Sequence, residues 1–259
     1  ILNYELEKQS ASPQFKIQNF YPPEAGKFKI SSQAVVLANE FLDAFPADVF
    51  QKKACPERSR GGGAWEMLFV ALEGETLSEA WRPVQSEDDL AHLARYASHA
   101  EDEQRVERAR GVEAWLDALA ALSPRMLALV FDYGDTAPLL YAPVRKFGTL
   151  KCHYRHTVDA RPFERVGEKD ITASVNFSHL EDAARARGFE ARTVELCAFL
   201  LQAGAERFMQ DESFRGEERQ GLLRMLDPTG MGGLFKVCIL ARGVPMPPLK
   251  SFREMVMGA

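Results

Sequence analysis

The residues best placed to do chemistry directly follow apolar runs of the chain. Asn39 and Glu40 end one such run, and Asp132 and Tyr133 end another. An apolar run without polar alternation is typical of a parallel strand that is covered on both faces. Ligands of open α/β sheets bind at the carboxyl ends of such strands. The four residues therefore predict a site at one sheet edge, although the alternative is that polar residues merely end two strands.

A further acidic residue, Glu7, ends the strand-like stretch 1–7. A carboxylate can accept two hydrogen bonds, so an acidic strand end in a nucleotide-type fold suits the paired hydroxyls of a ribose. The alternative is a solvated strand end, in which Glu5 is equally well placed.

Strand-like and helical patterns alternate along the rest of the chain, which indicates an α/β fold with a largely parallel sheet. Pro46 closes a short helix or turn over 40–46, and Asn176 is expected to cap a helix that ends before Gly188. We expect strands at 34–38, 48–53, 64–72, 104–108, 126–131, 148–156 and 234–242, and helices at 87–100, 111–122, 177–187, 193–210 and 216–226.

Composition excludes several classes of protein. The net charge of −5 argues against a general nucleic-acid binder, which would carry a basic face. No apolar run approaches the length of about 18 residues that marks a membrane span. The four cysteines form no CxxC pair, which fits a reducing compartment.

Other motifs fail the tests of context for metal, nucleotide or hydrolase sites. His153 and His156 are three residues apart on an expected strand and would point to opposite faces, so a hydrogen-bonding role is favoured over a metal. The glycines at 61–63 lack a following Lys-Ser/Thr pair, and we interpret 54–63 as a hairpin insertion. The stretch GMGG, 230–233, follows an expected helix and is interpreted as its exit. The sequence contains no GxSxG elbow.

Five stretches in one order resemble the MidA-like family of class I S-adenosylmethionine-dependent methyltransferases. That family includes the mitochondrial complex I assembly methyltransferase that modifies a protein arginine. The match spans nearly the whole chain. The stretches are LANEFLDAFP, FDYGD, GTLKCHYRH, GEKDITASVNFSHL and MLDPTGMGGLFKV.

The resemblance implies a Rossmann-like fold: a mostly parallel sheet with helices on both faces and an α+β insertion, here 145–230, that covers the substrate. The family's first strand and its Gly-rich loop are not found in this sequence, so 1–259 is expected to be a single, N-terminally truncated methyltransferase-like domain. A sheet without its central first strand would leave backbone groups unpaired, so we expect low stability.

The resemblance also implies the cofactor, S-adenosyl-L-methionine, and roles for individual residues. Methyl transfer requires the acceptor to be held in line with the methyl group, and a carboxylate can orient an arginine by bidentate hydrogen bonds. The implied roles are catalytic for Glu40, Asp132 and Tyr133, cofactor-binding for Glu7, Asn39 and Glu40, and substrate-binding for His156, Asp170 and Thr172, with no metal.

The function implied is methylation of a protein, on arginine, with a protein substrate as partner and with neither nucleic acid nor membrane. The location would be the cytoplasm of a bacterium or the mitochondrial matrix of a eukaryote. One alternative is a non-catalytic assembly or binding protein that has lost the cofactor loop. Another is a small-molecule methyltransferase of the same fold.

Overall fold

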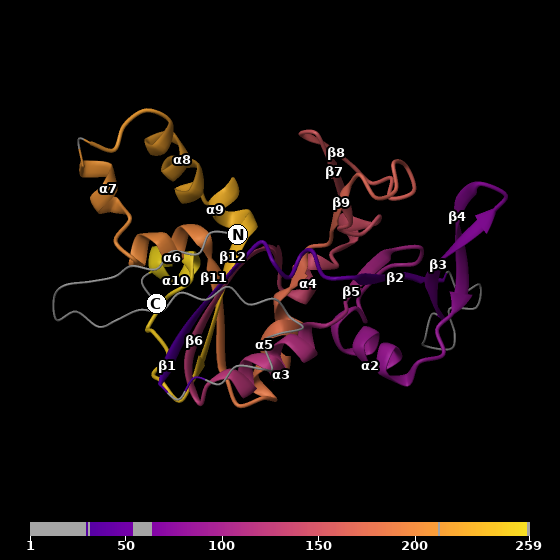
Figure 1. Cartoon of the computed structure of the whole chain (residues 1–259), viewed down its shortest axis with the longest axis horizontal. Coiled ribbons are helices and arrows are strands. Elements are labelled where there is room, and N and C mark those ends of the chain that lie inside the picture. Colours follow the sequence, from indigo (N-terminus) through magenta and orange to yellow (C-terminus); the bar gives the residue numbers. More distant parts are fainter. Residues whose placement is uncertain (1–29, 31, 54–63, 212, 258–259) are drawn as a thin grey trace.

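The computed structural model describes residues 30, 32–53, 64–211 and 213–257 (Figure 1). The predictions at Glu7, in the stretch 1–7 and in the insertion 54–63 lie outside these residues.

A central sheet carries the expected strands around Asn39 and Asp132. β6 pairs in parallel with β1 and with the short β10, whereas β12 runs antiparallel to both β6 and β11. Among the described strands the sheet is therefore mixed, and the predicted parallel arrangement holds only for β1, β6 and β10. In order of pairing, the strands are β1 (Gln33–Asn39), β6 (Arg125–Asp135), β12 (Phe235–Arg242) and β11 (Glu190–Glu195), with β10 (Val175–Asn176) paired to β6.

Helices cover both faces of this sheet, as predicted. Alternate residues of β12 show the two cores: Cys238 and Leu240 pack on the side of α3 and α5, and Val237 and Ile239 pack on the opposite side with Phe199 of α6. All four are fully buried, because strand side chains alternate between faces. The helices are α3 (Val112–Leu122), α5 (Phe177–Arg185), α6 (Leu196–Gln202), α7 (Glu206–Gln210), α8 (Glu217–Leu226), α9 (Met231–Leu234) and α10 (Phe252–Met257).

The strand β1 differs from the expectation that both of its faces are covered. Ala34 and Ala38 are buried in the core shared with α3. Val35 and Leu37, on the other face, are 59% and 70% exposed. Among the described strands β1 pairs with β6 alone, so it is an edge strand of the described part of the sheet.

A second, antiparallel sheet follows β1 along the chain. Its strands, in order of pairing, are β4 (Thr76–Pro83), β3 (Trp65–Glu73), β2 (Ala47–Lys52) and β5 (Arg105–Ala109). The helix α2 (Glu87–Tyr96) packs on it through Leu93, against Phe50 and Val106. The helix predicted over 87–100 ends earlier, at Tyr96. The strand β4 was not predicted, because its sequence mixes polar and apolar residues irregularly.

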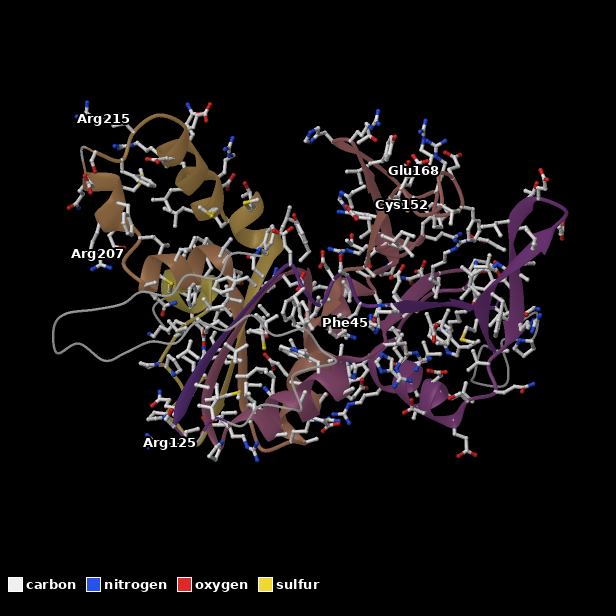
Figure 2. All side chains as sticks on the ribbon, in the orientation of Figure 1. Phe45, Arg125, Cys152, Glu168, Arg207 and Arg215 are labelled. Atoms are coloured by element: carbon white, nitrogen blue, oxygen red, sulfur yellow. The ribbon has the colours of Figure 1, made fainter. Side chains whose placement is uncertain are left out.

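A third, small sheet and two short helical turns stand beside the end of β1. The small sheet has the order β8 (Thr157–Asp159), β7 (Lys151–Tyr154) and β9 (Asp170–Thr172). The turns α4 (Ala137–Leu140) and η1 (Pro143–Arg145) connect β6 to it. Figure 2 labels Cys152 in this sheet and Phe45 on the connection from β1 to β2.

Several segments within the range 145–230 belong to the central layers. The helix α5 packs against the main core, and β11 pairs with β12. The substrate-covering insertion predicted over this whole range is therefore interrupted by parts of the central fold. β11 occupies the start of the predicted helix 193–210, where β-branched Thr193 and Val194 favour a strand.

The stretch GMGG forms most of the short helix α9 instead of a helix exit. A Cβ at Gly232 would lie 2.4 Å from the carbonyl oxygen of Met225, and one at Gly233 would lie 2.0 Å from that of Pro228. The glycines therefore permit close backbone packing of α9 against the end of α8.

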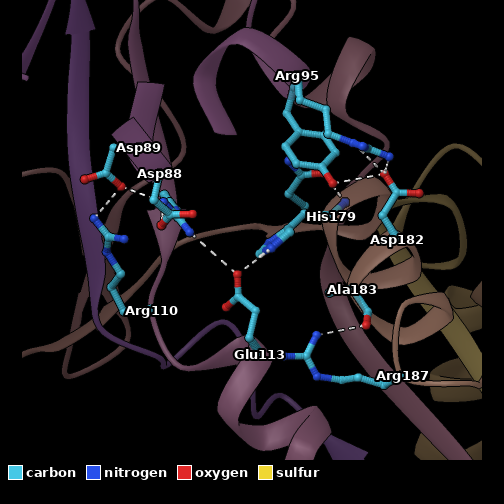
Figure 3. Close-up of polar contacts among 12 residues, drawn as sticks. Asp88, Asp89, Arg95, Arg110, Glu113, His179, Asp182, Ala183 and Arg187 are labelled. Carbon is cyan, nitrogen blue, oxygen red and sulfur yellow. Dashed lines mark hydrogen bonds and ion pairs between the residues drawn. The ribbon is translucent and has the colours of Figure 1, made fainter. Parts of the chain in front are cut away.

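A polar network joins the second sheet to the helices of the central sheet (Figure 3). Arg108 of β5, which is nearly fully buried, contacts Asp89 of α2 at 2.6 Å and Glu113 of α3 at 3.6 Å. Glu113 in turn contacts Nε2 of His179 in α5 at 3.0 Å. At the C-terminal end of α2, the hydroxyl of Tyr96 donates to Asp182 of α5 at 2.9 Å.

Candidate active site

The carboxyl end of β1 lies beside β6 just before Asp132, so the two polar clusters are neighbours, as the sequence predicted. Asn39 pairs with Phe131 in the parallel register, and the backbone N–H of Glu40 donates to the carbonyl oxygen of Phe131 at 2.9 Å. The strand β6, however, continues to Asp135. Asp132 and Tyr133 therefore lie within the strand and point to opposite faces, and the prediction that β6 stops at them is wrong.

The carboxylate of Asp132 is fully buried beneath the connection that leaves β1. Its Oδ2 accepts the backbone N–H groups of Phe41, Leu42 and Asp43 at 3.2, 2.9 and 3.3 Å. Burial and the nearby Asp43 carboxylate outweigh these donors and raise the pKa of Asp132 to about 7. In this position Asp132 shapes the loop that carries Glu40, and it presents no atom to solvent.

Three of the predicted residues gather at the exposed side of this edge. Asn39 and Glu40 are exposed, and Nδ2 of Asn39 donates to Oε1 of Glu40 at 3.4 Å. The ring of Tyr133 packs on Phe235 at a centroid distance of 4.0 Å. Burial, followed by the Glu40 carboxylate, raises the pKa of Tyr133. Glu40 itself has a φ of 45°, a left-handed conformation that a residue with a side chain seldom adopts.

The three predicted substrate residues lie in two different parts of the small sheet. Asp170 and Thr172 lie on β9, which adjoins the β1 loop, because the N–H of Ala173 donates to the carbonyl oxygen of Asp43 at 2.9 Å. His156 lies in the exposed turn between β7 and β8. Its expected place on a strand is therefore wrong, and its substrate role stays a prediction.

The structure brings two unpredicted residues, His153 and Asp43, to the same edge. His153 pairs with Asp170 across β7 and β9, and its Nε2 lies 3.4 Å from Oγ1 of Thr172. Burial and Glu40 raise the pKa of Asp43, whereas His153 opposes that shift. Both residues stand in the sequence stretches that suggested the site. The sequence pattern alone did not show which residues of these stretches face the site.

Glu107 of β5 anchors the start of the small sheet. This fully enclosed carboxylate accepts the N–H of Thr149 at 2.8 Å and its hydroxyl at 3.1 Å. Burial raises the pKa of Glu107. The hydroxyl oxygen of Thr149 also accepts the N–H of Ser174 at 3.1 Å. A Cβ at Gly148 would lie 1.9 Å from Oε1 of Glu107, which explains the glycine of GTL.

The chemistry of this edge is compatible with one side of a cofactor site. The exposed amide of Asn39 can donate and accept hydrogen bonds, and the exposed carboxylate of Glu40 can accept them from hydroxyl, amino or ammonium groups. Within the described residues, no cluster of three or more His, Cys, Asp or Glu side chains is arranged to hold a metal ion. The described helices include none of the length and hydropathy that would cross a bilayer.

The α/β sheet, with polar groups where its parallel strand β1 ends and with an antiparallel strand on the other side of β6, is compatible with the class of S-adenosylmethionine-dependent methyltransferases. Residues 6–194 match a family model described as a putative S-adenosyl-L-methionine-dependent methyltransferase, and the chain belongs to this family. Enzymes of this family use S-adenosylmethionine as cofactor.

Solved structures support the same assignment. A protein from Burkholderia thailandensis with bound S-adenosyl-homocysteine superposes with a TM-score of 0.73 at 28% identity, over 85% of this chain and 56% of that one. A native structure from the same organism gives a TM-score of 0.72 at 28% identity, over 83% and 57% of the two chains.

Curated relatives carry a more specific name. The protein arginine methyltransferase NDUFAF7, mitochondrial, of Rattus norvegicus is 31% identical over 216 residues, which cover 77% of this chain. The Mus musculus protein of the same name is 30% identical over 219 residues and 78% of this chain. The chain spans 44% of the length of each relative.

Proposed function

We propose that this chain forms the acceptor side of an S-adenosylmethionine-dependent methyltransferase site that modifies arginine in a protein. The observation that carries the proposal is the cluster of carboxylates at the carboxyl edge of β1 and β6. Glu40 is exposed there, Asp43 lies three residues further on, and the buried Asp132 accepts the backbone N–H of Asp43. A guanidinium is the planar cation that carboxylates bind by paired hydrogen bonds.

The cofactor would lie beside the acceptor at the end of β1. Asn39 and Glu40 would hold its polar groups, and Glu7, which lies outside the described residues, would receive the ribose hydroxyls as the sequence predicts. When bound, the sulfonium supplies an electrophilic methyl group. The chain then has to position the acceptor nitrogen in line with that group, which is a matter of orientation.

The neighbouring side chains suit this positioning role. Glu40 would orient the guanidinium, and the ring of Tyr133, packed on Phe235, would form an apolar side of the acceptor channel. Thr172 and Asp170 would line the opposite wall on β9. The similarity to proteins named as protein arginine methyltransferases supports a protein substrate.

The proposal is tested by transfer of tritium from methyl-labelled S-adenosylmethionine to a library of peptides with a central arginine. A matched library with central lysine serves as the acceptor control. We expect label on the arginine library, and a loss of about 100-fold or more in Glu40→Gln, because the neutral amide cannot bind a guanidinium as a carboxylate does.

Glu75→Gln, an exposed glutamate in the turn from β3 to β4, is the matched control variant and should retain wild-type transfer. Equal transfer by Glu40→Gln and wild type would remove the carboxylate role. A folded chain that neither binds the cofactor nor transfers the methyl group would favour the alternative of a non-catalytic binding protein.

A further inference from the structure

The face of the small sheet that borders the β1 loop carries a histidine, His153, to which the proposed function assigns no role. Strand register places His153 opposite Val158 of β8 and Asp170 of β9, so these three side chains share one face. Lys151 lies on the same face, two residues earlier along β7, and pairs with Thr172. His153 is half-buried, so its ring remains accessible from this face.

One side-chain contact orients this ring. Oγ1 of Thr172 lies 3.4 Å from Nε2 of His153. The ring also interacts electrostatically with the carboxylate of Asp43. The carbonyl oxygen of Asp43 is bound by the N–H of Ala173, which follows Thr172 directly. The β1 loop and β9 are therefore attached to each other where the histidine lies.

Arginine methylation needs a group that accepts a proton. The guanidinium is protonated at neutral pH and has no free electron pair for attack, so one N–H proton must leave as the nitrogen is methylated. In the balanced step, the N–C bond forms as the S–CH₃ bond breaks, and the electron pair of that bond goes to sulfur. The products are the methylated guanidinium, a neutral thioether and one proton.

We propose that His153 accepts this proton and that Asp43 stabilises the resulting imidazolium. This inference rests on the proposed function, because it assigns a role in the same methyl-transfer step. The other charged groups that face the ring are Asp170, across the strand pair, and Lys151, on the same strand. Thr172 acts as a positioning residue through its contact with Nε2.

The pH dependence of transfer to the central-arginine peptide library tests the role. We expect His153→Asn to lower kcat by about 100-fold while KM for the peptides changes little, because a general base contributes to the reaction and not to binding. The rise of kcat with pH that reports the histidine should also disappear. His99→Asn, at an exposed histidine remote from this edge, should match wild type.

Equal kcat and pH profiles in His153→Asn and wild type would overturn the inference while leaving the proposed function intact. The same holds if His156→Asn, and not His153→Asn, removes the pH-dependent rise. Circular dichroism of each variant separates these outcomes from misfolding, and His153→Gln provides a second substitution that keeps polarity.

A measurement without turnover separates this inference from the activity of the chain. In nuclear magnetic resonance of histidine-labelled protein, the arginine library should shift the Hε1 signal of His153 and leave that of His99 in place. A shift without methyl transfer would support the acceptor site and count against the transferase activity of this chain. No shift at saturating peptide would contradict the placement of His153.

Discussion

Residues at the predicted edge differ in whether they can contact a ligand or only shape the loop. Asn39, Glu40 and Tyr133 have exposed atoms, whereas Asp132 is fully buried under the backbone N–H groups that follow β1. Sequence pattern identified this group because apolar runs end there. The pattern could not show which of these residues contact a ligand and which shape the loop, because the orientation of Asp132 depends on how far β6 continues.

The left-handed conformation of Glu40 leads to a prediction on stability. A residue with a Cβ pays about 1 kcal/mol for this conformation, and glycine adopts it freely. We expect Glu40→Gly to leave the free energy of unfolding unchanged or to raise it by up to about 1 kcal/mol, and to remove methyl transfer. Urea unfolding checks the first part, with Glu40→Gln as the variant that keeps the strain. A clear loss of stability in Glu40→Gly would show that the side chain itself stabilises the fold.

Asp132→Ala should weaken the fold more than any change at the exposed residues of the edge. Without the carboxylate, the three N–H groups of residues 41–43 lose their shared acceptor in a buried place. The expected loss is about 2–4 kcal/mol in the free energy of unfolding, measured by urea denaturation. Asp132→Asn keeps one acceptor oxygen and should lose less. Equal losses in both variants would argue against this explanation.

At the scale of elements, most helices and strands of the central fold were predictable from periodicity. The helix 111–122 and the strands near 126–131 and 234–242 are present, as are the cap at Asn176 and the glycine after α5. The strand β11 was missed because its six residues run without a break into the helix α6. The pairing directions of β12 and β11 depend on tertiary contacts that no local pattern contains.

Glu107 gives a test of how the small sheet is anchored. Its carboxylate binds the backbone and hydroxyl of Thr149, and the Cβ of an alanine at position 148 would collide with it. Gly148→Ala also forces a side chain onto a φ of 79°. We expect a loss of about 2–4 kcal/mol in unfolding free energy, measured by urea denaturation.

Gly167→Ala is the matched control, since its φ is also positive at 84° but a Cβ there meets nothing within 4 Å. It should cost only about 1 kcal/mol. Similar losses at both glycines would mean that the collision with Glu107 contributes nothing.

At the scale of the whole molecule, the polar network between the sheets makes stability depend on pH. The hydrogen bond with His179 lowers the pKa of Glu113 to about 2. A carboxyl whose pKa falls on folding contributes stability that is present above its ordinary pKa and is lost as pH falls toward the folded value. The structure should therefore lose stability between about pH 4.5 and pH 2 through this group.

Urea unfolding of wild type and Glu113→Gln across this range measures the contribution. The difference in stability between the two proteins should be largest near neutral pH and should shrink as the pH falls. A constant difference would show that Glu113 does not titrate with folding. The network was not predictable from sequence, because Arg108, Glu113 and His179 come from three separate segments.

Calorimetric titration of the chain with S-adenosyl-homocysteine tests whether the end of β1, beside Asp132 of β6, is a methyl-transfer site. We expect a dissociation constant in the micromolar range, about −8 kcal/mol at 1 μM. Asn39→Ala should weaken it about tenfold, whereas His99→Asn should not change it. Absence of binding by a folded chain, or binding that Asn39→Ala leaves unchanged, would mean that this edge is not a cofactor site.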